Sequence, residues 1–204
     1  MPMFPLGVVL LPGAMMPLHV FEPRYRQMII DCLARDGDPE FGQTLITHGH
    51  ETGGGDQRAM IGTVAKMIDI NAIGESRYAL VASGTRRIKV EEWLEDDPYP
   101  VAHVADWPDD ESDRSGLPER IVTMTSRVRA CRELATRLGA PGIDSAAVEL
   151  SEDPVVATYN LAATAPIGPS DRLRLLSSPG PSSRLELLDE ILDDVEAMLK
   201  FRLS

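Results

Sequence analysis

The sequence predicts an α+β protein in which a β-rich region is followed by a bundle of helices. Short runs of β-forming residues, separated by glycine and proline, dominate residues 1–106. From residue 117 to residue 204, apolar residues recur every three or four positions, which is typical of amphipathic helices. Residues 107–116 are acidic and rich in turn-forming residues, so we expect a linker there.

Two short strands are predicted near the start of the chain. Residues 6–11 are almost wholly apolar and lie between Pro5 and Pro12-Gly13, as in a strand that is buried on both faces. Residues 15–20 form the second strand. Pro17 places this strand at a sheet edge or a bulge, because proline cannot donate a hydrogen bond to a β-ladder.

A helix is predicted directly after the second strand. Pro23 stands where the first turn of a helix tolerates proline, and Gly37 stands where the helix is expected to stop. Between them, apolar residues follow one another at helical spacing: Tyr25, Met28, Ile29, Cys32 and Leu33.

The rest of the first region is predicted to consist of strands and loops. The strands cover residues 44–47, 60–70, 77–82, 85–93 and 101–106. Gly62 suggests a bulge, Ser83-Gly84 suggests a turn or a bulge, and the glycine-rich residues 49–57 are typical of a loop. Many short strands with a single helix indicate a small, strongly bent barrel or a sandwich.

The second region is predicted to hold about four helices. The first extends from Pro118 to Gly139, the second covers about residues 154–165, and a short third follows Pro169. In the last helix, Ser183 and Glu186 have the spacing of a capping box. The apolar seam of that helix consists of Leu185, Leu188, Leu192, Val195 and Leu199.

Several segments resemble the N-terminal, substrate-binding domain of Lon proteases. Residues 4–28, which read FPLGVVLLPGAMMPLHVFEPRYRQM, resemble the motif that opens this domain. Residues 61–65 (IGTVA) look like a strand of the family, and residues 78–90 (YALVASGTRRIKV) look like its central hairpin. Leucines at 173–176 and 184–188 are similar to its last helices. The resemblance implies a pseudo-barrel lobe related to PUA-like folds, followed by a helical bundle.

The resemblance also implies a function. The Lon domain helps to recognise unfolded or tagged protein segments, so we expect such segments as partners, together with a separate protease or chaperone. The phosphate-binding pattern Gly-x-x-x-x-Gly-Lys-Ser/Thr does not occur, and no second region supplies the Ser-Lys dyad of Lon proteases. We therefore expect a non-catalytic binding module, with no cofactor and no ATPase or protease activity.

The composition argues against nucleic acid and membranes as partners. The chain has 32 acidic and 20 basic residues, a net charge of −12, and such a surface repels phosphates and anionic lipids. The densest basic cluster, Arg86-Arg87-x-Lys89, is short. No run of 18 apolar residues and no signal-peptide pattern occur, so we expect a cytoplasmic protein. Cys32 and Cys131 fall on apolar helix stripes and are expected to be reduced core thiols.

Three charged residues at the start of the first helix are candidates for a binding site. Glu22, Arg24 and Arg26 could form the rim of a shallow apolar groove, between the β-rich lobe and this helix, that holds an extended peptide. Arginine suits such a rim because its planar fork binds carboxylates bidentately. The structural alternative is that Glu22 caps the helix and Arg24 anchors a neighbouring loop.

Met15 and Met16 form a second candidate, because methionine adapts to varied apolar partners. On an edge strand they could receive an extended peptide by strand addition. The structural alternative is that the nine methionines of this chain fill gaps in a core that has few aromatic residues.

Other functions stay open as alternatives. A PUA-like nucleic-acid binder is opposed by the net charge. A metal-dependent or small-molecule enzyme could use His48, His50, Glu51 and Asp56, but His-x-His in a glycine-rich loop is a poor metal motif. The nucleophile pattern Gly-x-Ser-x-Gly does not occur. The acidic last helix could also dock a partner in a purely structural role.

Overall fold

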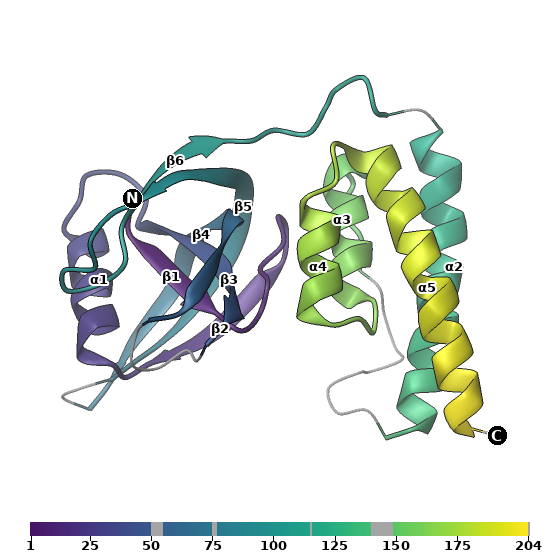
Figure 1. Cartoon of the computed structure of the whole chain (residues 1–204), viewed down its shortest axis with the longest axis horizontal. Coiled ribbons are helices and arrows are strands. Elements are labelled where there is room, and N and C mark those ends of the chain that lie inside the picture. The colour runs from purple at the N-terminus through teal and green to yellow at the C-terminus, as the bar shows by residue number, and fades with distance from the viewer. Residues whose placement is uncertain (50–54, 75–76, 115, 140–148, 204) are drawn as a thin grey trace. The chain divides into compact units, whose positions relative to one another are not determined.

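The computed structural model describes residues 1–49, 55–74, 77–114, 116–139 and 149–203. The chain divides into two compact units, Met1–Pro108 and Asp109–Ser204 (Figure 1). The segment expected as a linker, residues 107–116, spans this boundary. Trp107 donates its backbone N–H to the Arg87 carbonyl within the first unit, whereas Asp110 donates to the Pro179 carbonyl within the second.

In the residues that the structure describes, the first unit is a single mixed sheet with one helix. Its elements are β1 (Met3–Leu6), β2 (Met15–Val20), α1 (Pro23–Leu33), β3 (Glu40–His48), β4 (Gln57–Ile73), β5 (Arg77–Trp93) and β6 (Ala102–Asp106). The strand order is β1-β3-β4-β5-β2, with β6 also paired to β5; β1 and β3 are parallel and the other pairs are antiparallel. The α+β class is confirmed, and the described sheet is bent without closing into a barrel.

The core of the first unit lies between the sheet and α1. The helix buries the side chains of Tyr25, Met28, Ile29 and Cys32, as predicted, whereas Leu33, the last residue of the predicted stripe, is 48% exposed. These side chains pack with Phe4, Phe41 and other apolar residues of the sheet. The helix ends at Leu33, four residues before the glycine that was expected to stop it.

The first strand lies earlier in the chain than the apolar run predicts. Strand β1 pairs with β3. The residues that follow Leu6 form no hydrogen bonds of a β-ladder, even though Leu10 is buried. The Leu10 N–H donates instead to the Gln43 side-chain oxygen (2.8 Å), and the Leu10 carbonyl accepts from the Thr63 hydroxyl (2.7 Å). The predicted strand at 6–11 is therefore wrong, because buried side chains satisfy this backbone in place of a neighbouring strand.

Strand β5 continues through Ser83-Gly84, where the sequence left a turn or a bulge open. Its register with β4 shifts by one residue just after Gly84, so the Ser83-Gly84 pair marks a bulge within one long strand and not a turn. A Cβ atom at Gly84 would collide with the Leu11 carbonyl oxygen. Glycine is needed here because the bent strand passes directly over another backbone segment.

The second unit contains the four predicted helices: α2 (Leu117–Arg137), α3 (Pro154–Thr164), α4 (Pro169–Leu176) and α5 (Pro181–Leu203). Helices α2 and α5 pack against each other (Figure 1). The side chains that α2 buries include Met124, Val128 and Cys131, and those that α5 buries include Leu188 and Leu192.

The N-terminus of α5 differs from the predicted capping box. The helix begins at Pro181, so Ser183 and Glu186 lie inside it. The cap comes from far away in the sequence. The Ser183 N–H donates to the Asp113 carboxylate (2.8 Å), and the Ser182 N–H donates to the Asp113 carbonyl (3.1 Å). An acidic residue of the expected linker thus satisfies backbone donors that the first helical turn leaves free.

Candidate functional site

The junction between β2 and α1 exposes an aromatic side chain. Because side chains alternate along β2, Val20 points into the core and Phe21 points outward, where 59% of it is exposed. Glu22 has an extended backbone at the N-cap position of α1, and Pro23 supplies the first helical residue. The turn from strand into helix therefore holds Phe21 at the surface.

Phe21 lines two adjoining cavities. The first has a volume of about 220 Å³ and is lined by Phe4, Leu6, Pro17, Leu18, His19, Val20, Phe21, Glu22 and Tyr25. The second has a volume of about 210 Å³ and is lined by His19, Val20, Phe21, Ile73, Arg77 and Tyr78. Because the two cavities share three residues, we treat them as one surface and call it the Phe21 groove.

The floor of the Phe21 groove is aromatic and well packed. The rings of Phe4 and Tyr25 stack with their centroids 4.1 Å apart, and Phe4 also contacts Phe41 at 5.8 Å. Burial raises the pKa of Tyr25 to about 12, so its hydroxyl stays protonated at neutral pH. The groove thus has a neutral, apolar base.

Charged side chains lie at one rim of this groove. Arg24 donates from Nε to the Glu22 carboxylate (3.1 Å), and its guanidinium lies 4.5 Å from the centroid of the Tyr25 ring. The Glu22 carboxylate makes no capping hydrogen bond to the first turn of α1 within the described chain. Arg26 is half-buried on the same helix and is not among the lining residues. Of the three predicted charged residues, only Glu22 therefore lines the groove.

The two candidate methionines point in opposite directions. Met15 is 56% exposed, whereas Met16 is 8% exposed and belongs to the core. Neither residue lines the Phe21 groove. Because the alternation of β2 buries every second side chain, only Met15 is available at the surface of this strand.

Strand β2 offers a limited edge for strand addition. The Gly84 N–H donates to the Ala14 carbonyl, so the register turns the backbone groups of Met16 and Leu18 toward β5 and those of Met15, Pro17 and His19 away from it. Pro17 has no N–H, so the middle of the outward-facing edge lacks a donor. A peptide that paired with β2 would lack the hydrogen bond from residue 17. The Phe21 groove is therefore the better candidate for the peptide-binding site.

Sequence reasoning missed the central residue of the groove, Phe21. A signal was nevertheless present. Alternation along residues 15–20 continues to Phe21 and puts it on the outward side with Met15, Pro17 and His19. A large aromatic residue at an outward position, directly before a proline-initiated helix, is a surface feature that the alternation alone predicts.

The thiols are unsuited to nucleophilic chemistry. Both cysteines are buried and unpaired with each other, as expected. Burial raises the pKa of the Cys32 thiol to about 11 and also raises the pKa of Cys131. Because the thiolate is the reactive form, neither side chain is activated for catalysis.

The basic cluster is occupied by intramolecular contacts. Arg87 is buried, donates to the Trp107 and Pro108 carbonyls, and lies 4.3 Å from the Trp107 ring centroid. Arg86 forms ion pairs with Glu40 (3.2 Å) and Asp106 (2.9 Å). These contacts leave little of the cluster for phosphate groups.

No group of three or more potential metal ligands occurs among the residues that the structure describes. Two members of the proposed metal cluster, His50 and Glu51, lie outside the described residues. Across the described parts of the chain, no helix combines the length and apolar character needed to cross a bilayer.

Comparisons with known proteins agree on one family. The family model described as the ATP-dependent protease La (LON) substrate-binding domain matches residues 1–194. Lon protease 2 of Myxococcus xanthus is 26% identical, and the Lon protease of Anaeromyxobacter dehalogenans (strain 2CP-C) is 27% identical, each over 98% of this chain. The chain spans 24% of the length of each of these relatives.

Solved structures are similar over nearly the whole chain. The crystal structure of the Lon N-terminal domain protein from Xanthomonas campestris is 28% identical with a TM-score of 0.63, and the match covers 92% of this chain and 95% of that one. The N-terminal domain of the Mycobacterium avium complex Lon protease is 18% identical with a TM-score of 0.65, and covers 95% of this chain and 97% of that one. At 18% identity, this second match shows that the two chains share a fold.

Proposed function

Because this chain belongs to the family of Lon substrate-binding domains, we propose that it binds unfolded segments of other proteins in the Phe21 groove and performs no catalysis of its own. The observation that carries this proposal is the exposure of Phe21 between two cavities with an apolar floor. An exposed aromatic side chain beside a preformed hollow is typical of an interaction site.

The binding energy in this proposal comes from apolar burial. Covering apolar surface contributes about 25 cal/mol per Å² before the costs of ordering the bound segment. An unfolded segment loses conformational freedom on binding, so we expect modest affinity. Passage of the bound segment to a separate protease or chaperone, in the cytoplasm and without a cofactor, is part of the same proposal.

The groove carries few charges. Glu22 and Arg24 have opposite charges and pair with each other. Arg77 is exposed and lines the second cavity, and the lining is otherwise mostly apolar. We therefore expect the groove to select segments mainly by their aromatic and large aliphatic residues and to tolerate either sign of charge nearby.

The test compares two phenylalanines that are both exposed. Phe21→Ala removes the ring from the groove, and Phe201→Ala removes a ring that is 82% exposed on α5. The probes are a fluorescein-labelled, reduced and carboxymethylated globular protein and an array of peptides from its sequence, and binding is followed by fluorescence anisotropy. Phe21→Ala is expected to weaken binding about five- to thirtyfold, since burying a large apolar side chain contributes about 1–2 kcal/mol.

The control variant should bind as tightly as the unmodified chain. Both alanine variants should keep the thermal unfolding midpoint of the unmodified chain, because neither replaces a core residue. Absence of binding to every probe would remove the proposal, as would equal weakening by both substitutions. Tight binding to an RNA oligonucleotide that falls steeply with salt would support the nucleic-acid alternative instead.

A further inference from the structure

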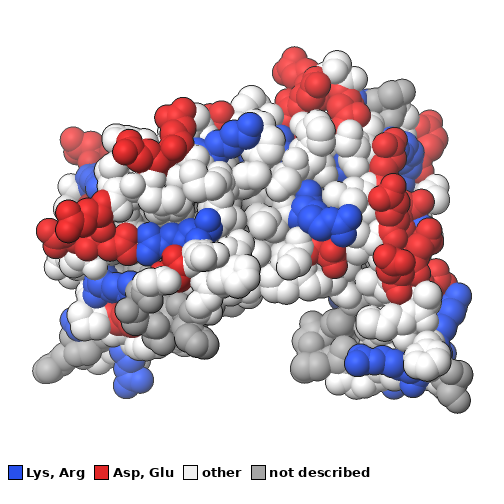
Figure 2. All heavy atoms as spheres, viewed as in Figure 1, with Lys and Arg blue, Asp and Glu red and all other residues white. Residues whose placement is uncertain are grey.

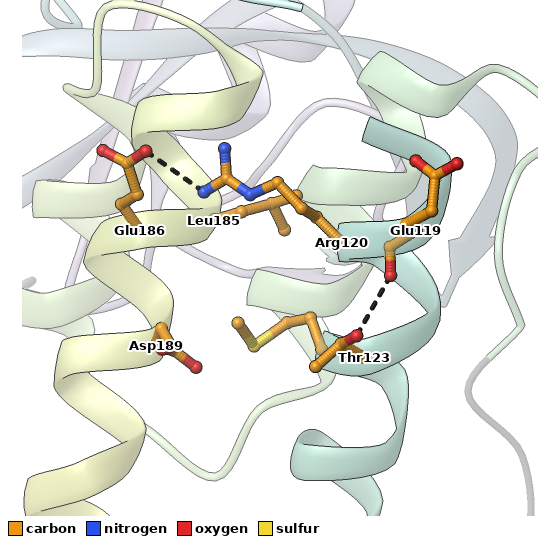
Figure 3. Close-up of a pocket in the computed structure, with 7 residues that line it drawn as sticks. Glu119, Arg120, Thr123, Leu185, Glu186 and Asp189 are labelled. Carbon is orange, nitrogen blue, oxygen red and sulfur yellow. Dashed lines mark hydrogen bonds and ion pairs between the residues drawn. The ribbon is translucent and has the colours of Figure 1, made fainter. Parts of the chain in front are cut away.

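A second hollow lies in the helical unit, between α2 and α5. Its volume is about 230 Å³, and Figure 3 shows the residues that line it: Glu119, Arg120, Thr123, Met124, Leu185, Glu186 and Asp189. Met124 and Leu185 belong to the core, so they supply an apolar floor. We call this surface the α2–α5 groove.

The rim of the α2–α5 groove is acidic. Three carboxylates line it against one guanidinium, and Arg120 already pairs with Glu186 (3.3 Å) and donates to the Ser182 carbonyl (3.0 Å). The next arginine along α2, Arg127, bonds to Asp189 and to Asp193. These ion pairs engage the nearby cations and also the Glu186 and Asp189 carboxylates, so the excess negative charge comes from the exposed Glu119 and from the exposed acidic residues further along α5.

The acidic surface extends along α5. Residues 186–196 contain six acidic side chains and no basic one. Figure 2 shows acidic side chains gathered along this part of the helical unit.

We propose that the α2–α5 groove docks a basic segment of a partner polypeptide. An apolar side chain of the partner rests on Met124 and Leu185, and lysine or arginine side chains on either side of it face Glu119, Glu186 and Asp189. Complementary charge steers association and selects the partner, while the apolar floor supplies the burial that holds the segment in place.

Charge decides between the candidate occupants. A second copy of this chain that docked by the same surface would place acidic α5 against acidic α5, which costs energy because like charges repel. Nucleic acids and anionic lipids carry the same sign as the groove and are repelled for the same reason. The basic side chains of a polypeptide can pair with the acidic rim, and its apolar side chains can pack on the floor.

The test uses two labelled peptides that differ only in charge. Both carry the same leucine and methionine residues, one with four lysines and the other with four glutamates at the remaining helix-forming positions. In the full chain carrying Phe21→Ala, which weakens the Phe21 groove, fluorescence anisotropy should show clearly tighter binding of the lysine peptide than of the glutamate peptide. The affinity for the lysine peptide should fall as salt is raised, because salt screens exposed charges.

Matched variants locate the binding surface. Glu119→Gln together with Glu186→Gln removes two rim charges, and Glu190→Gln together with Asp194→Asn removes two charges on α5 that helical geometry places further from α2. The rim pair should weaken binding of the lysine peptide about fivefold, and the second pair should change it less than twofold.

Three results would overturn this proposal: equal loss in the two paired variants, equal binding of the two peptides, or a dimer of the free chain that the rim pair dissociates. The preference for the lysine peptide over the glutamate peptide should be the same in the unmodified chain and in Phe21→Ala, because the Phe21 groove takes apolar segments of either charge. This arm separates the α2–α5 groove from the Phe21 groove, so failure of either proposal can be recognised by itself.

Discussion

Arg184 of α5 is fully buried and donates to the carboxylate of Asp109 at 2.5 Å, although 75 residues separate the two in the chain. The guanidinium also lies 3.5 Å from the centroid of the Tyr159 ring and donates to the Thr158 hydroxyl at 2.7 Å. A buried cation is tolerated only when it is paired and hydrogen-bonded, and these contacts meet that requirement. The ion pair with Arg184 thus anchors Asp109, which is the first residue of the helical unit, to the core of that unit.

Removal of the Asp109 carboxylate should destabilise the helical unit strongly. Asp109→Ala leaves the Arg184 charge buried without its anion, so the free energy of unfolding should fall by about 3–5 kcal/mol. Urea denaturation followed by circular dichroism measures the change. The matched control is Asp171→Ala, which breaks the more exposed pair with Arg174 and should cost less than about 1 kcal/mol. Similar losses in both variants would contradict the role given to the buried pair.

The cap of α5 can be tested at Asp113. Asp113→Ala removes the oxygen that accepts from the Ser183 N–H and should lower the free energy of unfolding by about 0.5–2 kcal/mol. Glu111→Ala removes an exposed charge from the same acidic segment and should have little effect. Ser183→Ala separates the two explanations of the cap, since a local capping box would make it as costly as Asp113→Ala. The structure predicts that it is much milder.

The bend of β5 depends on the absence of a side chain at Gly84. Gly84→Ala places a methyl group against the Leu11 carbonyl oxygen, so we expect a loss of about 1–3 kcal/mol in the free energy of unfolding. Gly168→Ala is the control, because its Cβ meets nothing within 4 Å and its φ is −81°. Gly168 is the N-cap of α4, where alanine is less favourable, so this control should cost up to about 1 kcal/mol. Thermal unfolding of both variants measures the difference. Equal midpoints would show that β5 can move away from Leu11 at little cost.

Stability should fall at alkaline pH because buried acids, among them Tyr25 and Cys32, resist ionisation. Burial raises the pKa of Tyr25 from 10.0 to about 12 and the pKa of Cys32 from 9.0 to about 11. Above pH 9 the unfolded chain releases protons that the folded chain retains, so the free energy of unfolding decreases as pH rises toward 12. Below pH 9 both groups are protonated in the folded and the unfolded chain, so their contribution to the free energy of unfolding is fully present.

The variant Tyr25→Phe isolates one of these contributions. It keeps the ring that stacks on Phe4 and removes the ionisable hydroxyl. Its free energy of unfolding should therefore decline less steeply than that of the unmodified chain between pH 10 and pH 12, as measured by urea titrations at several pH values. Parallel declines would mean that the Tyr25 hydroxyl is not protected from ionisation in the folded state.

The candidate site could be predicted from the sequence only in part. The motif around Glu22 and Arg24 located the junction of strand and helix, and the alternation along β2 implies an outward Phe21. The cavities beside Phe21 require Phe4 from β1 and Tyr78 from β5, and no local pattern reveals that these strands meet there. A groove depends on segments that are far apart in the chain, whereas periodicity reports only on neighbours.

The sequence by itself determined the helices and most of the strands, because alternation, helical spacing and the positions of proline and glycine are properties of neighbouring residues; it misplaced the first strand, which lies at Met3–Leu6. Tertiary structure alone decided which partner satisfies each buried polar group: Gln43 and Thr63 for the backbone of Leu10, Asp113 for the start of α5, and Asp109 for Arg184. The physical reason is that a polar group removed from water must find a hydrogen-bonding partner wherever the packed chain supplies one. Packing brings such partners together over any distance in the sequence.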